Sequence, residues 1–141
     1  LMKKVSENFY VSPQIEPSNI DGLSKDKFDI VVCNRPDGEE SNQPSKIEIS
    51  NECQKKSLEF IDLEIVPGDI NFETIKRTKE ILDTNKKVFA YCRTGTRSIT
   101  LWAFASCYTK EVVDIISKAS NAGYELAHFK DAFVSFKSSL S

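Results

Sequence analysis

The chain has 141 residues, which is long enough for one domain with its own hydrophobic core. Hydrophobic residues make up 40% and charged residues 28%, and the net charge of -2 gives no electrostatic reason to expect nucleic acid or an anionic membrane as partner. No apolar run approaches the ~20 residues of a membrane span. The first residues carry no apolar signal region, so the sequence predicts a cytoplasmic protein.

Strand-like and helix-like segments alternate along the chain. Short apolar runs predict strands at residues 9–11, 28–33, 60–65 and 87–91. Capping residues and helical spacing predict helices at residues 17–23, 45–56, 71–82, 99–105, 111–119 and 126–136. This order favours a single α/β domain over residues 1–141, with a mainly parallel central sheet and helices on both faces. Sites in such sheets gather at the carboxyl ends of the strands.

One polar loop, residues 91–98 (Tyr-Cys-Arg-Thr-Gly-Thr-Arg-Ser), connects an expected buried strand to an expected helix. The backbone N–H groups of such a turn and of the helix N-terminus can hold an anion and favour a thiolate over a thiol. Arg97 lies five positions after Cys92 and can donate two hydrogen bonds to the same anion. The pattern therefore predicts Cys92 as a nucleophile and Arg97 as the residue that binds the anion and stabilises the transition state.

The remaining loop residues are expected to line the anion site. Gly95 allows a positive φ or a close approach of the backbone to the anion. Arg93 lies at the mouth of the site, and Thr94 and Thr96 belong to the same cradle. Ser98 has two equal interpretations: its hydroxyl donates to the thiolate, or it satisfies the backbone of the first helical turn.

The other cysteines and the single histidine predict no metal site and no other cofactor. No Cys-x-x-Cys pair occurs, so zinc is not expected, and cytosolic thiols stay reduced. Cys33 and Cys107 fall in apolar segments and are expected in the core, whereas Cys53 fits either a core or a polar setting. His128 alone cannot make a multi-histidine metal site.

Several motifs together resemble one known family. They are Val-Ser-Pro-Gln at 11–14, Asn-Arg-Pro-Asp-Gly-Glu-Glu at 34–40, Gln-Pro-Ser at 43–45, and the loop 91–98 leading into Leu-Trp at 101–102. The chain resembles the phosphatase-like domain of the beta-lactamase hydrolase-like proteins, which occurs alone or fused to a metallo-hydrolase module. The resemblance implies a fold like that of dual-specificity cysteine phosphatases. It does not imply beta-lactamase activity, because the histidine-rich metal motif is missing from this sequence.

The loop itself is similar to two enzyme classes. Cysteine phosphatases carry His-Cys, a glycine three residues after the cysteine and an arginine six after it. Here Gly95 is in place, Arg97 comes one residue early, and Tyr91 replaces the histidine. Rhodanese-type sulfurtransferases often carry Cys-Arg-x-Gly-x-Arg-Ser, which the loop matches, and a shorter cradle suits a sulfane sulfur. We therefore expect a phosphatase-type hydrolase first, a sulfurtransferase second, and a non-catalytic anion-binding module third.

Phosphate-ester cleavage also needs a general acid. Asp69 lies 23 residues before Cys92, on the loop where the phosphatase fold would place its acid, although a plain turn also explains Pro-Gly-Asp. Asp37 is the second candidate, and Arg35 beside it could aid anion capture, although a type I turn accounts for Pro-Asp as well. Sulfur transfer needs neither aspartate. The expected partner is a small anion, either a phosphate ester or a sulfane-sulfur donor.

Overall fold

The computed structural model describes residues 2–141, in which five strands form one sheet in the order β1-β2-β5-β3-β4. Its strands are β1 (Lys3–Ser6), β2 (Phe9–Ser12), β3 (Ile30–Cys33), β4 (Glu59–Asp62) and β5 (Val88–Tyr91). Strands β2, β5, β3 and β4 run parallel, and only β1 pairs antiparallel with its neighbour β2. The mainly parallel sheet predicted from the sequence is confirmed.

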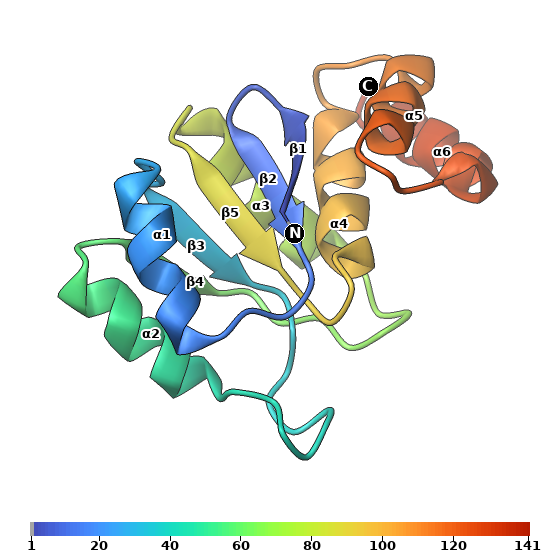
Figure 1. Cartoon of the computed structure of the whole chain (residues 1–141). Coiled ribbons are helices and arrows are strands. Elements are labelled where there is room, and N and C mark those ends of the chain that lie inside the picture. Colours follow the sequence, from blue (N-terminus) through green and yellow to red (C-terminus); the bar gives the residue numbers. More distant parts are fainter. Residues whose placement is uncertain (1) are drawn as a thin grey trace.

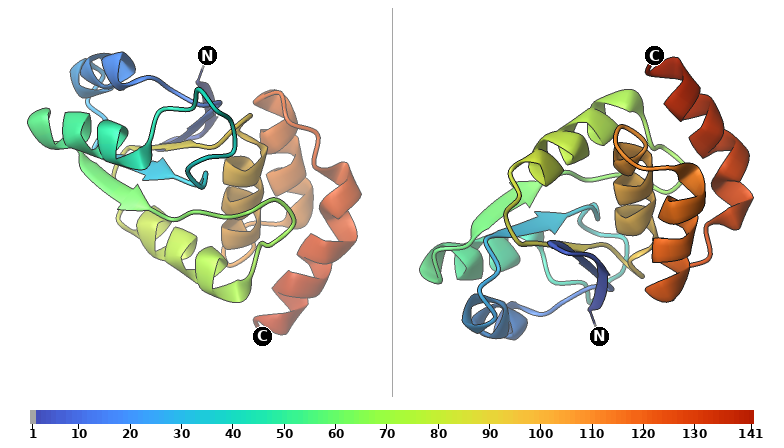
Figure 2. Two further views of the ribbon diagram at one scale, coloured as in Figure 1. Left: turned by 90° about the horizontal axis from the view of Figure 1, so that it is seen from below. Right: turned by 90° about the horizontal axis from the view of Figure 1, so that it is seen from above.

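Helices cover both faces of this sheet, as predicted (Figure 1). Helices α1 (Ile20–Lys25) and α2 (Lys46–Lys55) lie on one face, and α3 (Phe72–Asp83) and α4 (Thr96–Ser106) lie on the other. Helices α5 (Val112–Asn121) and α6 (Lys130–Ser139) pack outside α4 (Figure 2). Short 3₁₀ turns, η1 (Pro17–Asn19) and η2 (Ala127–Phe129), precede α1 and α6.

The side chains of the central strands alternate between the two faces. Val31 and Phe89 point into the core beneath α1 and α2, whereas Val32 and Ala90 pack beneath α3 and α4. All four are at most 3% exposed, which is the burial expected of central parallel strands. The two cores hold the carboxyl ends of β3 and β5 rigidly side by side, and the candidate site begins there.

The starts of α2 and α3 were predicted correctly from their capping residues. Ser45 caps α2, and its side chain and that of Glu48 form the reciprocal capping box. Asn71 caps α3 in the same way with Thr74. Each of these hydrogen bonds joins residues three apart, so the local sequence alone is enough to specify them.

The structure corrects two strand predictions. Strand β1 was not predicted, because Lys3 and Lys4 are exposed and give the segment little apolar pattern. The strand predicted at residues 60–65 ends at Asp62, although Leu63 and Ile65 remain buried. Their N–H groups bond to the carbonyls of Cys33, the last residue of β3, and of Asn34 after it, which carries the chain past the end of β3 without a regular ladder.

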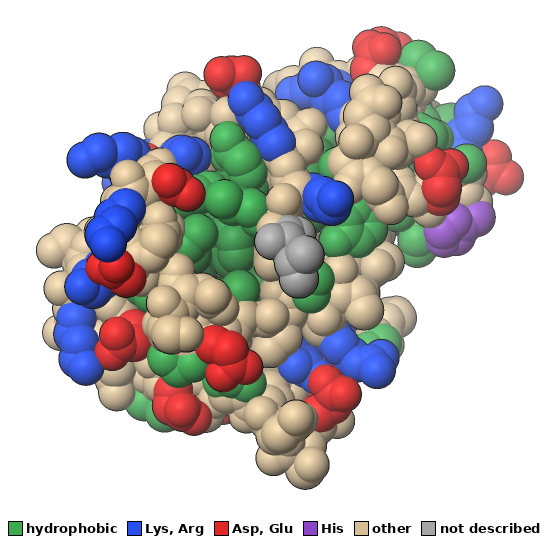
Figure 3. Space-filling model, in the orientation of Figure 1, with side chains coloured by type: hydrophobic (Ala, Val, Ile, Leu, Met, Phe, Trp, Pro, Cys, Tyr) green, Lys and Arg blue, Asp and Glu red, His purple; other side chains and the backbone are tan. Residues whose placement is uncertain are grey.

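The surface carries both signs of charge. Acidic and basic side chains are interspersed over the face drawn in Figure 3. Within residues 2–141 no helix is both long enough and apolar enough to cross a bilayer.

Candidate active site

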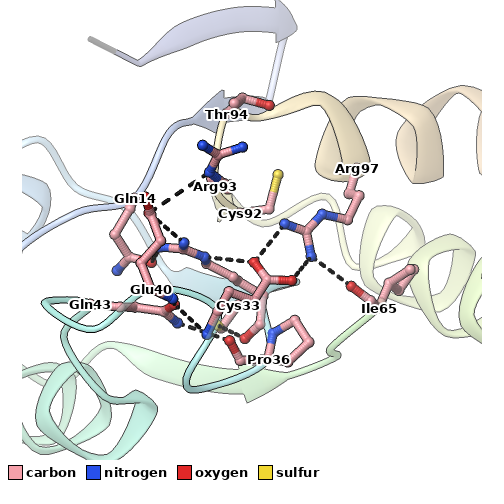
Figure 4. A network of polar contacts seen from close by, with 12 residues as sticks. Gln14, Cys33, Pro36, Glu40, Gln43, Ile65, Cys92, Arg93, Thr94 and Arg97 are labelled. Atoms are coloured by element: carbon pink, nitrogen blue, oxygen red, sulfur yellow. Dashed lines mark hydrogen bonds and ion pairs between the residues drawn. The ribbon is translucent and has the colours of Figure 1, made fainter. Parts of the chain in front are cut away.

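The loop 91–98 forms the predicted strand-loop-helix turn at the end of β5 (Figure 4). Gly95 is the N-cap of α4 and has φ 96°, a left-handed conformation that glycine adopts without a steric penalty. Its N–H donates to Sγ of Cys92 at 3.1 Å. The first-turn N–H groups of α4 have no intrahelical partner, so they are available to an anion at this end of the helix.

Cys92 differs from the other three cysteines in its hydrogen bonding. Cys33 and Cys107 donate their thiol protons to backbone carbonyls, at 3.2 and 3.4 Å, and burial raises the pKa of both thiols. Burial also raises the pKa of Cys53, to about 11. All three lie in the core, which confirms the prediction for Cys33 and Cys107. Cys92 is also fully buried, but its sulfur accepts a backbone N–H and so occupies a place that suits a thiolate.

Arg97 is held by a carboxylate and a carbonyl. Its Nη1 donates to Oε2 of Glu39 at 2.9 Å and to the Ile65 carbonyl at 2.8 Å, and its Nη2 donates to Oε1 of Glu39 at 2.8 Å. These three bonds use the Nη1–Nη2 end of the guanidinium. The edge formed by Nε–H and the second Nη2 proton is the part left to bind an oxyanion in the bidentate way typical of arginine.

Glu39 joins Arg97 to the second predicted arginine, Arg35. The Arg35 side chain is 1% exposed, and its Nε donates to Oε1 of Glu39 at 2.8 Å. Its remaining nitrogens donate to Gln14 at 3.0 Å and Glu40 at 2.7 Å. Arg35 therefore acts on this site through Glu39. Contact with the Arg97 guanidinium lowers the pKa of Glu39, and Arg35 adds to this effect against the opposing effect of burial.

The two candidate acids have different surroundings. Asp37 accepts the N–H of Lys46 at 2.8 Å, which gives its carboxylate a structural use at the start of α2. Asp69 is exposed, and its N–H closes a turn onto the Val66 carbonyl at 3.1 Å. No hydrogen bond in residues 2–141 involves the Asp69 carboxylate, so this side chain has no structural partner there.

A cleft of about 810 Å³ opens beside the loop. Its lining combines carboxylates and residues of the loop 91–98 with apolar residues of α4, η2, α6 and the loop after β4. Arg93 lines it with 60% of its side chain exposed and its Nε 3.8 Å from Glu40. The lining residues are Glu39, Glu40, Pro67, Gly68, Ile70, Arg93, Thr94, Thr96, Arg97, Thr100, Phe104, Phe129 and Ala132.

The predicted hydroxyl groups of the loop have partners within the protein. Ser98 is buried and donates to Oδ1 of Asn34 at 2.7 Å, while the Asn34 amide donates to the Leu63 carbonyl at 2.8 Å. The Ser98 hydroxyl thus joins the first turn of α4 to the residue after β3. Its donation to the Cys92 thiolate stays a prediction. The Thr94 and Thr96 hydroxyls bond to each other at 3.1 Å.

Tyr91, which replaces the phosphatase histidine, belongs to the core. Its side chain packs with Phe89 and Cys33 on the face covered by α1 and α2 and is 1% exposed. Burial raises its pKa, so the phenol stays neutral. The loop is therefore supported from below by an aromatic core residue.

Sequence reasoning missed Glu39 and Tyr124 as parts of the site. Glu39 lies in a motif that carries the family resemblance, but nothing in its spacing links it to Arg97. Tyr124 follows α5 and donates its hydroxyl proton to the Thr94 carbonyl at 2.8 Å. His128 is exposed, and its ring lies tilted beside that of Phe129.

The fold defines a class: this is an α/β domain with the fold of the tyrosine and dual-specificity phosphatases. A kinase-associated phosphatase, solved with its catalytic-site cysteine replaced by serine, has the same fold. It is 14% identical, with a TM-score of 0.77 over 99% of this chain and 93% of that one.

The family follows from the sequence match. Residues 2–109 match the model of the phosphatase-like domain of beta-lactamase hydrolase-like proteins, and the chain belongs to that family. A proposed phosphatase from Neisseria meningitidis is 30% identical, with a TM-score of 0.81 over 95% of this chain and 96% of that one. A beta-lactamase hydrolase-like protein from Agrobacterium fabrum is 22% identical over 87% of this chain, which spans 29% of that protein's length.

Proposed function

We propose that this domain is a cysteine-dependent phosphatase acting on small phosphate esters. The observation that carries the proposal is the arrangement of Cys92 and Arg97 around the start of α4. The sulfur accepts the Gly95 N–H, and the Nε–Nη2 edge of Arg97 is not used by Glu39 or Ile65. The oxygens of a phosphoryl group could occupy the space served by this edge and by the helix N–H groups.

The reaction would proceed in two steps. The Cys92 thiolate attacks phosphorus and forms an S–P bond while the P–O bond to the leaving group breaks. Asp69 is the proposed proton donor to the leaving oxygen, because its carboxylate is unpaired on a loop whose neighbours Gly68 and Ile70 line the cleft. Water then attacks phosphorus, releasing inorganic phosphate and the thiolate.

The first experiment is hydrolysis of p-nitrophenyl phosphate by the wild type, Cys92→Ser and Cys53→Ser. Cys53→Ser is the matched control, because Cys53 lies on the buried face of α2, within the core. Turnover that is lost in Cys92→Ser and kept in Cys53→Ser would support the proposal. Turnover that survives in Cys92→Ser, or is absent from the wild type, would contradict it.

Loop length favours a second candidate, rhodanese-type sulfur transfer. Arg97 comes five residues after Cys92, one fewer than in the cysteine phosphatases, and a smaller cradle suits a sulfane sulfur. In that reaction the thiolate would attack the outer sulfur of thiosulfate, form a persulfide on Cys92 and release sulfite. Incubation with thiosulfate followed by mass spectrometry should then find one extra sulfur on Cys92, removable by cyanide. If neither reaction occurs and Cys92→Ser still binds phosphate, the site is an anion-binding module.

A further inference from the structure

The hydroxyl of Tyr124 and the sulfur of Cys92 lie at opposite ends of one peptide group. The carbonyl oxygen of Thr94 accepts from Tyr124 at 2.8 Å, and the N–H of the same peptide, on Gly95, donates to Cys92 Sγ at 3.1 Å. In a trans peptide the C=O and the N–H point in opposite directions. Fixing the carbonyl on the outside of the loop therefore aims the N–H at the sulfur inside.

A helix end fixes the position of Tyr124. Gly123 follows α5 with φ 94°, its N–H bonds to the Ser120 carbonyl at 2.9 Å, and the Tyr124 N–H bonds to the Ala119 carbonyl at 2.9 Å. This double bond pattern is the Schellman motif, which sets the direction of the chain leaving a helix. Ala119 itself is fully buried against the core, so Tyr124 projects from a rigid support.

The identity of residue 95 agrees with this contact. A Cβ on Gly95 would overlap the Tyr124 hydroxyl and lie 2.9 Å from its Cζ, whereas a Cβ on the other glycines would meet no atom within 4 Å. The close approach of Tyr124 thus requires glycine here for a second reason besides its positive φ. Burial raises the pKa of Tyr124, and the neighbouring Cys92 adds to this, so the phenol keeps the proton that it donates.

We propose that Tyr124 is a positioning residue for the nucleophile: it holds the Thr94–Gly95 peptide so that the Gly95 N–H stabilises the Cys92 thiolate. Without the phenol, the peptide is free to rotate, and the sulfur loses a directed donor while the rest of the loop stays in place. The role rests on the proposed function of Cys92 as a nucleophile. It is not a catalytic role, because the Tyr124 oxygen bonds to the backbone of the loop and does not need to touch the substrate.

The test is the pH profile of Cys92 alkylation in the folded protein. The wild type, Tyr124→Phe and Tyr108→Phe are treated with iodoacetamide across a pH series, and mass spectrometry of the peptides follows Cys92 separately from the other thiols. Tyr108→Phe removes a phenol whose ring packs on Phe136, outside the loop. We expect Tyr124→Phe to react about fivefold more slowly near neutral pH, with a midpoint at higher pH, because the neutral hydrogen bond that orients the Gly95 N–H toward the sulfur is lost. At a pH above the midpoint the rates should converge, and Tyr108→Phe should follow the wild type.

Superimposable profiles for the wild type and Tyr124→Phe would overturn the proposal, and so would a wild-type Cys92 that shows no ionisation midpoint before the protein unfolds. A parallel assay with p-nitrophenyl phosphate and thiosulfate separates this failure from that of the proposed function. If the alkylation profile shifts but the wild type shows neither activity, Tyr124 is still a positioning residue and the proposed enzymatic function is contradicted. Cys92-dependent turnover with an unshifted profile would support the enzyme and reject the positioning role of Tyr124.

Discussion

The carboxylate of Glu39 accepts two hydrogen bonds from the end of the Arg97 guanidinium, at 2.8 and 2.9 Å, although 58 residues separate the two in sequence. One of its oxygens also accepts from the buried Arg35. Glu39 thus neutralises charge on two arginines, and it takes the Nη1–Nη2 end of Arg97 rather than the edge that faces an incoming anion. It orients the arginine before any substrate arrives, which lowers the ordering cost of binding.

Replacing Glu39 by glutamine should destabilise the domain. The amide keeps the shape but loses the charge that compensates Arg35 and Arg97, and we expect a loss of about 1–3 kcal/mol in the free energy of unfolding. Urea unfolding near neutral pH measures it. Glu59→Gln is the control, because Glu59 is exposed on the edge strand β4 and should change stability by less than about 0.5 kcal/mol. Equal losses in the two variants would contradict the structural role of Glu39.

The effect of Glu39→Gln should disappear in acid. The hydrogen bonds from Arg97 lower the pKa of Glu39 below the usual range of a glutamate. A carboxyl with a lowered pKa in the folded state contributes stability above its unfolded pKa and loses it as the pH falls through its folded pKa. The difference in unfolding free energy between wild type and variant should therefore be full near neutral pH and shrink below about pH 4.5. A difference that stays constant in acid would assign the effect to packing instead.

Arg97→Lys tests the fork geometry of the site. Lysine keeps the charge but cannot bond to both oxygens of Glu39, to the Ile65 carbonyl and to an oxyanion at once. If Cys92-dependent hydrolysis is found, we expect kcat/KM to fall by about 10²–10³-fold, the usual effect of removing one oxyanion-stabilising donor. Arg77→Lys, on an exposed position of α3, is the control and should match the wild type. A lysine variant with near wild-type kcat/KM would show that charge alone is enough.

Local patterns predicted the elements better than they predicted the contacts of the site. The Ser45 capping box and the turn at Cys92 use neighbours within a few residues, and both are present. The Glu39–Arg97 pair and the Tyr124–Thr94 bond span 58 and 30 residues, so they depend on how the elements pack. No periodicity or motif carries that information.

The roles of single residues were also hard to predict from local sequence. The sequence indicated that Arg35, in the same loop as Asp37, could aid the capture of an anion. The structure buries the Arg35 guanidinium among Glu39, Glu40 and Gln14, so that its charge is already compensated within the protein. Burial and partners are properties of the packed fold, and a loop composition does not reveal them.

Gly95→Ala should destabilise the domain more than Gly38→Ala. Both glycines have a positive φ, 96° and 78°, so both variants carry the cost of a left-handed alanine, about 1 kcal/mol. Only at position 95 would the new Cβ also overlap Tyr124, and a Cβ at position 38 meets nothing within 4 Å. Thermal unfolding of the two variants gives the comparison. Equal shifts in Tm would mean that Tyr124 moves aside without cost, which would weaken the case for its fixed position.

The assignment of Asp69 as the proton donor predicts a dependence on the leaving group. A general acid matters most when the leaving oxygen is basic, so Asp69→Asn should lower kcat more for phenyl phosphate than for p-nitrophenyl phosphate, whose leaving group departs readily as the anion. Asp37→Asn is the matched comparison. Its Oδ1 accepts the Lys46 N–H at the start of α2, and an asparagine oxygen can accept the same bond, so this variant should keep the fold without selecting between the two substrates. If Asp37→Asn shows the leaving-group dependence and Asp69→Asn does not, the loop after β3 supplies the acid. If neither does, the leaving oxygen takes its proton from water.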